Sequence, residues 1–109
     1  MAVKKRSIKP AASDTRALDG LVKAMLTQQT PAELRTFLID LCTPAELQAL
    51  ADRWRVVPLL VEGAAYRDIH ERTAVSVTTV GRIARCLEFG AGGYRRAVDR
   101  LGLRVNAQH

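Results

Sequence analysis

Hydroxyl and arginine side chains share one segment of the chain with regularly spaced apolar residues. In RTAVSVTTVGRIARCL, residues 72–87, the apolar residues recur at helical spacing, which predicts one buried face of a helix. Those apolar residues are Val77, Val80, Ile83, Ala84 and Leu87. The polar residues between them are Ser76, Thr78, Thr79, Arg82 and Arg85. A threonine hydroxyl can bond a base edge and an arginine can bind guanine through two hydrogen bonds, so this polar face suits DNA.

A shorter helix and a tight connection precede the polar face. AAYRDIHER predicts the short helix, TAV the connection, and SVTTVGRIARCLEFG a longer helix capped by Ser76 and ended by Gly90. Together they predict a helix-turn-helix, whose second helix enters the major groove with its N-terminal residues at the base edges. The residues predicted at that surface are Ser76, Val77, Thr78, Thr79 and Arg82. A merely solvated helix pair is the alternative, because such pairs also occur in proteins that bind no DNA.

Basic residues gather toward the two ends of a chain whose net charge is +6. Residues 1–14, MAVKKRSIKPAASD, have no apolar period and predict a flexible basic arm, while residues 105–109 predict a frayed tail. Further cations for phosphate contacts are Lys4, Lys5, Arg6, Arg67, Arg72 and Arg85. A basic surface suits a polyanion such as nucleic acid, although many small proteins carry this much charge and bind none.

The residue types of common catalytic and metal sites do not occur in usable combinations. The sequence holds no nucleophile–base pair, no paired carboxylates at a plausible spacing and no phosphate-binding loop, so we expect neither an enzyme nor a cofactor. Cys42 and Cys86 match no zinc or redox spacing, so we expect no metal site and two buried free thiols in a reducing cytoplasm. No segment is apolar enough to span a membrane or to serve as a signal peptide.

One short motif, TPAEL, occurs twice and predicts the starts of two helices. The copies lie at Thr30–Leu34 and Thr43–Leu47. Each copy has threonine as the N-cap, proline at the first helical position and glutamate at the third, which is a capping box. We expect helices over residues 31–41 and 44–62.

Helical patterns account for the remaining segments as well. The helix over residues 44–62 contains Pro58, which should kink it, and is followed by Gly63 as a C-cap. An apolar stripe predicts an earlier helix over residues 15–28, and YRRAVDRLGL predicts a last amphipathic helix. With the helix-turn-helix, the sequence predicts an all-α fold of six helices.

Two stretches together resemble the Trp repressor superfamily: TPAELQALADRWRVVPLLVEG, and YRDIHERTAVSVTTVGRIARCL with the ending EFGAGGYRRAVDRL. The ending is more similar to the YerC/YecD-type branch than to the Trp repressor itself. The resemblance implies an intertwined homodimer, with residues 15–104 as one helical domain for dimerisation and DNA binding. It also implies two recognition helices about one DNA turn apart, which would read a near-palindromic operator.

The resemblance also bears on a small-molecule effector. Arg53 and Arg82 match the two arginines that sandwich tryptophan in the Trp repressor, so these residues with Ile83 and Cys86 form the possible effector pocket. A glycine beside the second arginine corresponds to Ile83, and a serine that holds the ligand corresponds to Cys86. A branched side chain at Ile83 should fill the pocket, so we do not expect tryptophan to gate binding. Arg53 would then pair with Asp52, Glu46 or an acid of the partner chain.

One position in the turn of the helix-turn-helix departs from the branch that the chain resembles. Ala74 stands where that branch usually has glycine, at a site that tends to need a positive φ. An alanine there costs roughly 1 kcal/mol of strain unless the turn differs.

These observations predict a cytoplasmic, homodimeric, sequence-specific DNA-binding regulator of transcription, acting as a repressor on double-stranded DNA. Two alternatives stay open. The first is a helical protein-interaction module without DNA binding, and the second is a DNA binder gated by a small molecule other than tryptophan, held between Arg53 and Arg82.

Overall fold

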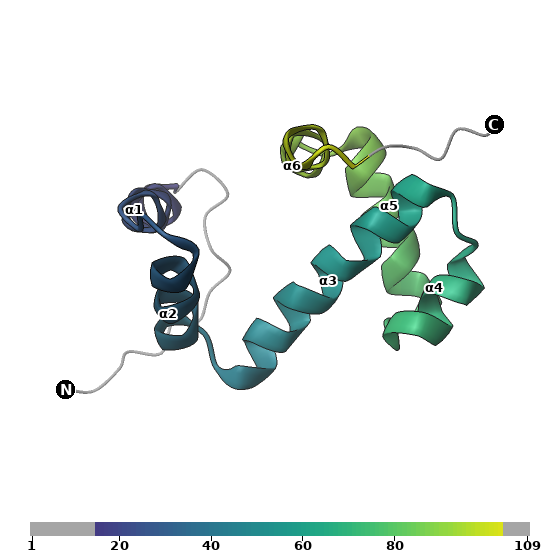
Figure 1. The fold of residues 1–109 in the computed structure, drawn as a ribbon, viewed down its shortest axis with the longest axis horizontal. Helices are drawn as coiled ribbons and strands as arrows, with labels where there is room; N and C mark the ends of the chain where they lie inside the picture. Colours follow the sequence, from purple (N-terminus) through teal and green to yellow (C-terminus); the bar gives the residue numbers. More distant parts are fainter. Residues whose placement is uncertain (1–14, 104–109) are drawn as a thin grey trace. The chain divides into compact units, whose positions relative to one another are not determined.

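A computed structural model describes residues 15–103, and all the regular secondary structure in this range is helical. The six helices are α1 (Arg16–Leu26), α2 (Pro31–Leu41), α3 (Pro44–Glu62), α4 (Tyr66–Thr73), α5 (Val77–Phe89) and α6 (Gly93–Leu101) (Figure 1). The all-α prediction is therefore confirmed, with helix ends within two residues of those expected. The predicted basic arm (1–14) and frayed tail (105–109) lie outside the described residues. None of the helices in residues 15–103 has the length and hydropathy needed to span a bilayer.

The two TPAEL motifs cap their helices in slightly different ways. At α3, the Thr43 hydroxyl accepts a bond from the Glu46 amide (3.1 Å), and the Glu46 carboxylate accepts one from the Thr43 amide (2.8 Å). This is the predicted capping box. At α2, Thr30 accepts from the Glu33 amide (3.1 Å), but the Glu33 carboxylate accepts from the amide of Gln29 (2.7 Å). The second box therefore closes one residue earlier than predicted, because the carboxylate takes the preceding amide.

Helix α3 is the longest element and continues through its internal proline. Pro58 removes one backbone donor, yet the helix extends four residues further, to Glu62. It ends as predicted at Gly63, whose φ of 91° lies in the left-handed region.

Residues 42–109 form one of two compact units of the chain, and the described core lies in it. The C-terminal half of α3 packs against α4 and α5, and α5 packs against α6. Buried side chains from all four helices form this core: Val56, Val57, Val61, Ile69, Val80, Ile83 and Val98. The core holds α5 on α3, so apolar packing sets the position of the helix that was predicted to enter the major groove.

The apolar spacing in α5 predicted its buried face correctly except at its first residue. Val80 and Ile83 are buried, whereas the Val77 side chain is 46% exposed. Each three-residue step turns the helix by about 300°, so the apolar residues drift by about 60° per step. Val77 and Ile83 therefore cannot point in the same direction, and Val77 belongs to the outer surface.

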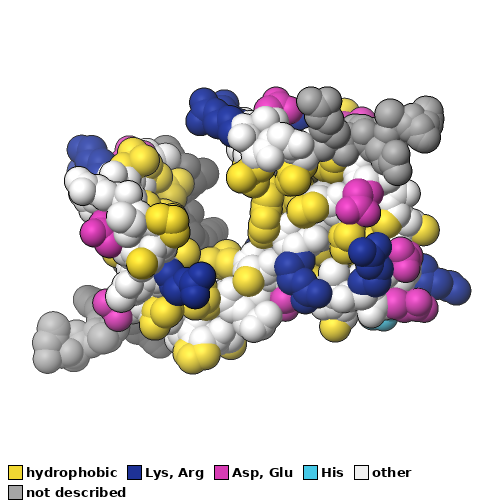
Figure 2. All heavy atoms as spheres, in the orientation of Figure 1, with side chains coloured by type: hydrophobic (Ala, Val, Ile, Leu, Met, Phe, Trp, Pro, Cys, Tyr) yellow, Lys and Arg dark blue, Asp and Glu magenta, His cyan; other side chains and the backbone are white. Residues whose placement is uncertain are grey.

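The other compact unit, residues 1–41, contains α1 and α2, and neither helix has a buried side chain. Large apolar side chains lie on its surface instead: Leu18, Val22, Leu26, Ile39 and Leu41. Figure 2 shows yellow, apolar side chains at the surface of these helices. Large apolar side chains exposed in this number are typical of an interaction surface.

Candidate nucleic-acid interface

Helices α4 and α5 form the predicted helix-turn-helix. Helix α4 has 8 residues, α5 has 13, and Ala74–Ser76 connect them. Both helices pack on α3 and on one another (Figure 1). Ile69 of α4 and Val80 of α5 are fully buried. The pair is thus a rigid unit that presents the N-terminal end of α5.

The connection is held by side chains that sequence reasoning did not single out. Thr73 is buried; its hydroxyl donates to the Ile69 carbonyl (2.7 Å) and accepts from the Val75 amide (3.1 Å). The Nδ1 of His70 donates to the Val75 carbonyl (2.8 Å). A threonine at the last position of a short helix is a recognisable signal for such a bond, because its hydroxyl can bond nearby backbone groups.

Ala74 ends α4 in the left-handed conformation, with φ of 66°. The expectation of a positive φ is confirmed, and the alanine carries the strain. Replacing Ala74 with glycine should therefore raise the free energy of unfolding by about 0.5–1 kcal/mol, the relieved strain less the added unfolded-state entropy. Thermal unfolding at one fixed protein concentration measures this gain. Ala91→Gly is the matched control, since Ala91 has no positive φ; an equal gain in both variants would contradict the strain at Ala74.

Ser76 is the N-cap of α5, as predicted. Its Oγ accepts a bond from the Thr79 amide (3.1 Å) and donates to the Thr79 Oγ1 (3.0 Å). The first amides of a helix have no partner within the helix, and they form a favourable place for an anion. Ser76 therefore orders both the helix start and the hydroxyl of Thr79.

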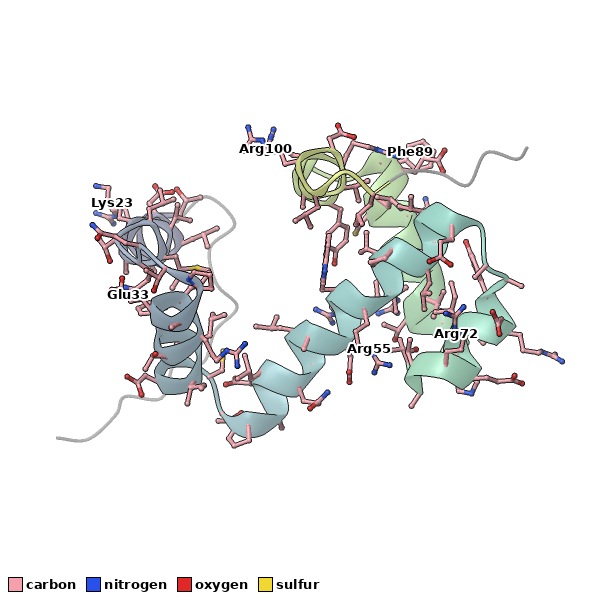
Figure 3. All side chains as sticks on the ribbon, viewed as in Figure 1. Lys23, Glu33, Arg55, Arg72, Phe89 and Arg100 are labelled. Atoms are coloured by element: carbon pink, nitrogen blue, oxygen red, sulfur yellow. The ribbon has the colours of Figure 1, made fainter. Side chains whose placement is uncertain are left out.

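The predicted DNA-binding residues lie on the surface of this unit. Thr79 is half-buried, and the exposed ones are Ser76, Val77, Thr78, Arg82, Arg85, Arg67 and Arg72. On α5, Thr78, Arg82 and Arg85 are spaced four and three residues apart, so they form one stripe along the helix. Phe89 continues this stripe with a side chain that is 75% exposed, near the start of α6 (Figure 3). Sequence reasoning missed Phe89, although its spacing from Arg85 contained the signal.

The arginines near this stripe are available for anions. Arg72 pairs with Asp68 at 3.5 Å, but both side chains are 51% exposed, so solvent weakens the pair. Within residues 15–103, Arg67 and Arg85 have no ion-pair partner.

The four residues of the possible effector pocket surround one small depression. Arg53, Arg82, Ile83 and Cys86 line about 220 Å³, together with Thr79 and Tyr94. Ile83 is 4% exposed and belongs to the core, so its side chain forms the buried base of this depression.

The expectation of two buried thiols is wrong. Cys42 is half-buried, and Cys86 is exposed because it lies to one side of the α5 face that carries Val80 and Leu87. Neither of the two acids of its own chain that were expected for Arg53 pairs with it in residues 15–103, and Asp52 instead lies 3.7 Å from Arg55. An ion pair between Arg53 and an acid of the partner chain stays a prediction. Among residues 15–103, no group of three His, Cys, Asp or Glu side chains could hold a metal ion.

Comparison with known proteins places this geometry in a family. The sequence profile of the Trp repressor protein matches residues 16–102. YerC of Bacillus subtilis is 38% identical over 86 residues, which cover 79% of this chain and 83% of YerC. Two crystal structures each match this structure with a TM-score of 0.77, and each match covers 84% of this chain. The TrpR-like protein of Eubacterium eligens is 36% identical with 94% of its chain covered, and a candidate Trp repressor of Staphylococcus aureus is 34% identical with 91% covered.

The matched range includes all six helices. It therefore contains the exposed apolar helices and the helix-turn-helix alike. The chain belongs to the Trp repressor family, a family of non-enzymatic DNA-binding regulators of transcription.

Proposed function

We propose that the protein acts in the cytoplasm as a homodimeric transcriptional repressor that occupies a near-palindromic operator through α5 of each copy. The observation that carries this proposal is the exposed stripe of Thr78, Arg82 and Arg85 on the second helix of a rigid helix-turn-helix. Residues of this type at this place can reach base edges in the major groove.

A second copy of the chain is the partner that best suits α1 and α2. Both helices lack buried side chains and expose several large apolar ones, and the family profile covers both. A two-fold pair would bury these faces, so that residues 15–104 form one domain only in the dimer, and would place two copies of α5 on one duplex.

Each part of the surface has a distinct role in this proposal. Thr78, Thr79 and Arg82 read bases, while Val77 offers an apolar contact and Ser76 orders the helix start. Arg67, Arg72 and Arg85 bind phosphates, with Lys4, Lys5 and Arg6 of the arm as additional cations. Phosphate contacts set the affinity and its salt dependence, and base contacts set the specificity.

Replacing Arg82 with alanine tests the base-reading role. We expect a loss of roughly 1–3 kcal/mol in binding to the preferred duplex and a relaxed sequence preference. Arg85→Ala is the matched control, because it removes an equal charge one turn away and should weaken all duplexes alike. Titration of labelled duplexes measures both; an equal loss on preferred and random DNA for Arg82→Ala would contradict the role.

Tryptophan is not expected to control this repressor, because Ile83 occupies the floor of the Arg53–Arg82 depression. The melting temperature of the protein should stay unchanged in millimolar tryptophan, whereas a ligand at about 100 times its Kd would add about 2.7 kcal/mol of stability. Differential scanning fluorimetry of the protein and of Ile83→Ala checks this. A clear tryptophan-dependent rise in the unsubstituted protein would show that the isoleucine does not block the site.

A second candidate function keeps the DNA binding and adds a different effector. The depression of about 220 Å³ between Arg53 and Arg82 favours it, because two guanidinium groups suit a small anion. In that case, a small carboxylate or phosphate compound would raise the melting temperature and change DNA affinity together.

A further inference from the structure

Helix α3 carries a row of polar side chains that ends on the helix-turn-helix. The Gln48 Nε2 donates to the Asp52 Oδ1 (2.9 Å), and the Arg55 Nη1 lies 3.7 Å from the same oxygen. The Arg55 Nη2 then donates to the main-chain carbonyl of Arg72 in α4 (3.1 Å). Figure 3 labels both arginines, one on α3 and one on α4. The row thus connects the first half of α3 to the end of α4.

The acceptor in α4 is a group that needs a partner from outside its helix. Arg72 lies in the last turn, where main-chain carbonyls have no intrahelical donor and the helix dipole is negative. A guanidinium is a charged, planar donor with fixed geometry, so it caps such a carbonyl well. Among the hydrogen bonds within residues 15–103, this one alone joins a side chain of α3 to α4, the turn or α5.

The bond between Arg55 and the Arg72 carbonyl lies directly before the turn that leads into α5. Thr73 and Ala74 directly follow Arg72, and the Thr73 hydroxyl and the His70 ring both bond Val75 in the middle of the turn. Apolar packing is non-directional and holds the helices together, whereas a hydrogen bond constrains an angle as well as a distance. The bond from Arg55 therefore constrains how α4 and the turn are rotated on α3.

We propose that Arg55 is a positioning residue, which fixes the orientation of α5 on α3 and contributes to sequence-specific DNA binding without contacting DNA. Asp52 of α3 supports this role, because its carboxylate pairs with the Arg55 guanidinium and so limits where that group can move. This proposal rests on the proposed function, since orientation matters only if α5 reads DNA. It assigns Arg55 a different role from Arg67, Arg72 and Arg85, whose charges bind phosphates.

Substitutions at Arg55 and Arg72 separate the two roles. Arg55→Gln is expected to weaken binding to the preferred duplex about 3- to 10-fold, the effect of one charge-assisted hydrogen bond from a side chain that is 52% exposed, and to unrelated duplexes less than about 2-fold. Arg55→Lys keeps the charge but not the planar donor, so it should recover only part of the loss. Arg72→Ala keeps the carbonyl that Arg55 binds and removes a phosphate contact, so it should weaken both duplexes equally.

A measurement without DNA tests the positioning directly. Hydrogen exchange at the Ala74 and Val75 amides, which donate to the His70 carbonyl and the Thr73 hydroxyl at the end of α4, should become about 5- to 10-fold faster in Arg55→Gln and not in Arg72→Ala. Unchanged exchange in Arg55→Gln would overturn the proposal. Equal loss on all duplexes would also overturn it, because that result makes Arg55 a phosphate contact. If the unsubstituted protein prefers no duplex, the proposed function fails, and the exchange rates alone decide whether Arg55 holds the turn.

Discussion

If the chain forms the proposed homodimer through α1 and α2, replacing Val22 with aspartate should separate it into single chains. Val22 lies in the middle of α1 between Leu18 and Leu26, and all three apolar side chains are exposed in the single chain. A carboxylate buried at this face without a partner would cost about 3 kcal/mol or more, which corresponds to roughly a 100-fold weaker dimer. Operator binding should weaken with it, because two linked half-sites bind more tightly than one.

Sedimentation velocity over a range of protein concentrations measures this effect. Lys23→Asp is the matched control, since it places the same carboxylate on the next residue of α1, where the side chain is exposed and polar (Figure 3). We expect Lys23→Asp to remain dimeric. A dimer that is unchanged in Val22→Asp would show that α1 does not form the contact between the copies.

Replacing Ile69 with alanine should destabilise the helix-turn-helix strongly. Ile69 is fully buried in the core between α3, α4 and α5. Removing a side chain of this size from a packed core costs about 2–5 kcal/mol, through lost burial and the cavity that remains. The total stability of a domain is about 5–15 kcal/mol, so Ile69→Ala removes a large part of it.

Urea denaturation at a fixed protein concentration measures the loss. Val77→Ala is the control, because this valine is 46% exposed and its loss should change stability by less than about 0.5 kcal/mol. Equal losses in the two variants would contradict the core described for residues 56–98.

The helix boundaries could be predicted from the sequence because local signals set them. Thr43, Ser76 and Gly63 act within their own helix ends, so neighbouring residues suffice to identify them. The capping box at α2 was predicted only in part. The Glu33 carboxylate accepts from the amide of Gln29 rather than from the adjacent amide of Thr30. Val77 was placed on the buried face although the spacing itself turns it away from Ile83, by about 60° for each three-residue step.

The contacts that hold the site could not be predicted, because they join residues far apart in the sequence. Arg55 reaches the Arg72 carbonyl across 17 residues, and nothing in either neighbourhood indicates the other. The bonds of Thr73 and His70 to Val75 are made across Ala74, whose left-handed backbone the residue type alone does not favour. The exposure of Cys86 depends in the same way on the orientation of α5.

The proposed function is tested most directly by the affinity of the protein for duplexes selected from a random pool, measured against salt concentration without added ligand. A dimeric DNA reader should select a near-palindromic consensus with half-sites about one helical turn apart. The expected log–log salt slope is about −5 from roughly six phosphate contacts, made by three arginines in each of two copies, and is steeper where the cations of the arm add contacts. No enriched sequence, together with a slope near zero, would contradict DNA reading and favour a helical module that binds another protein.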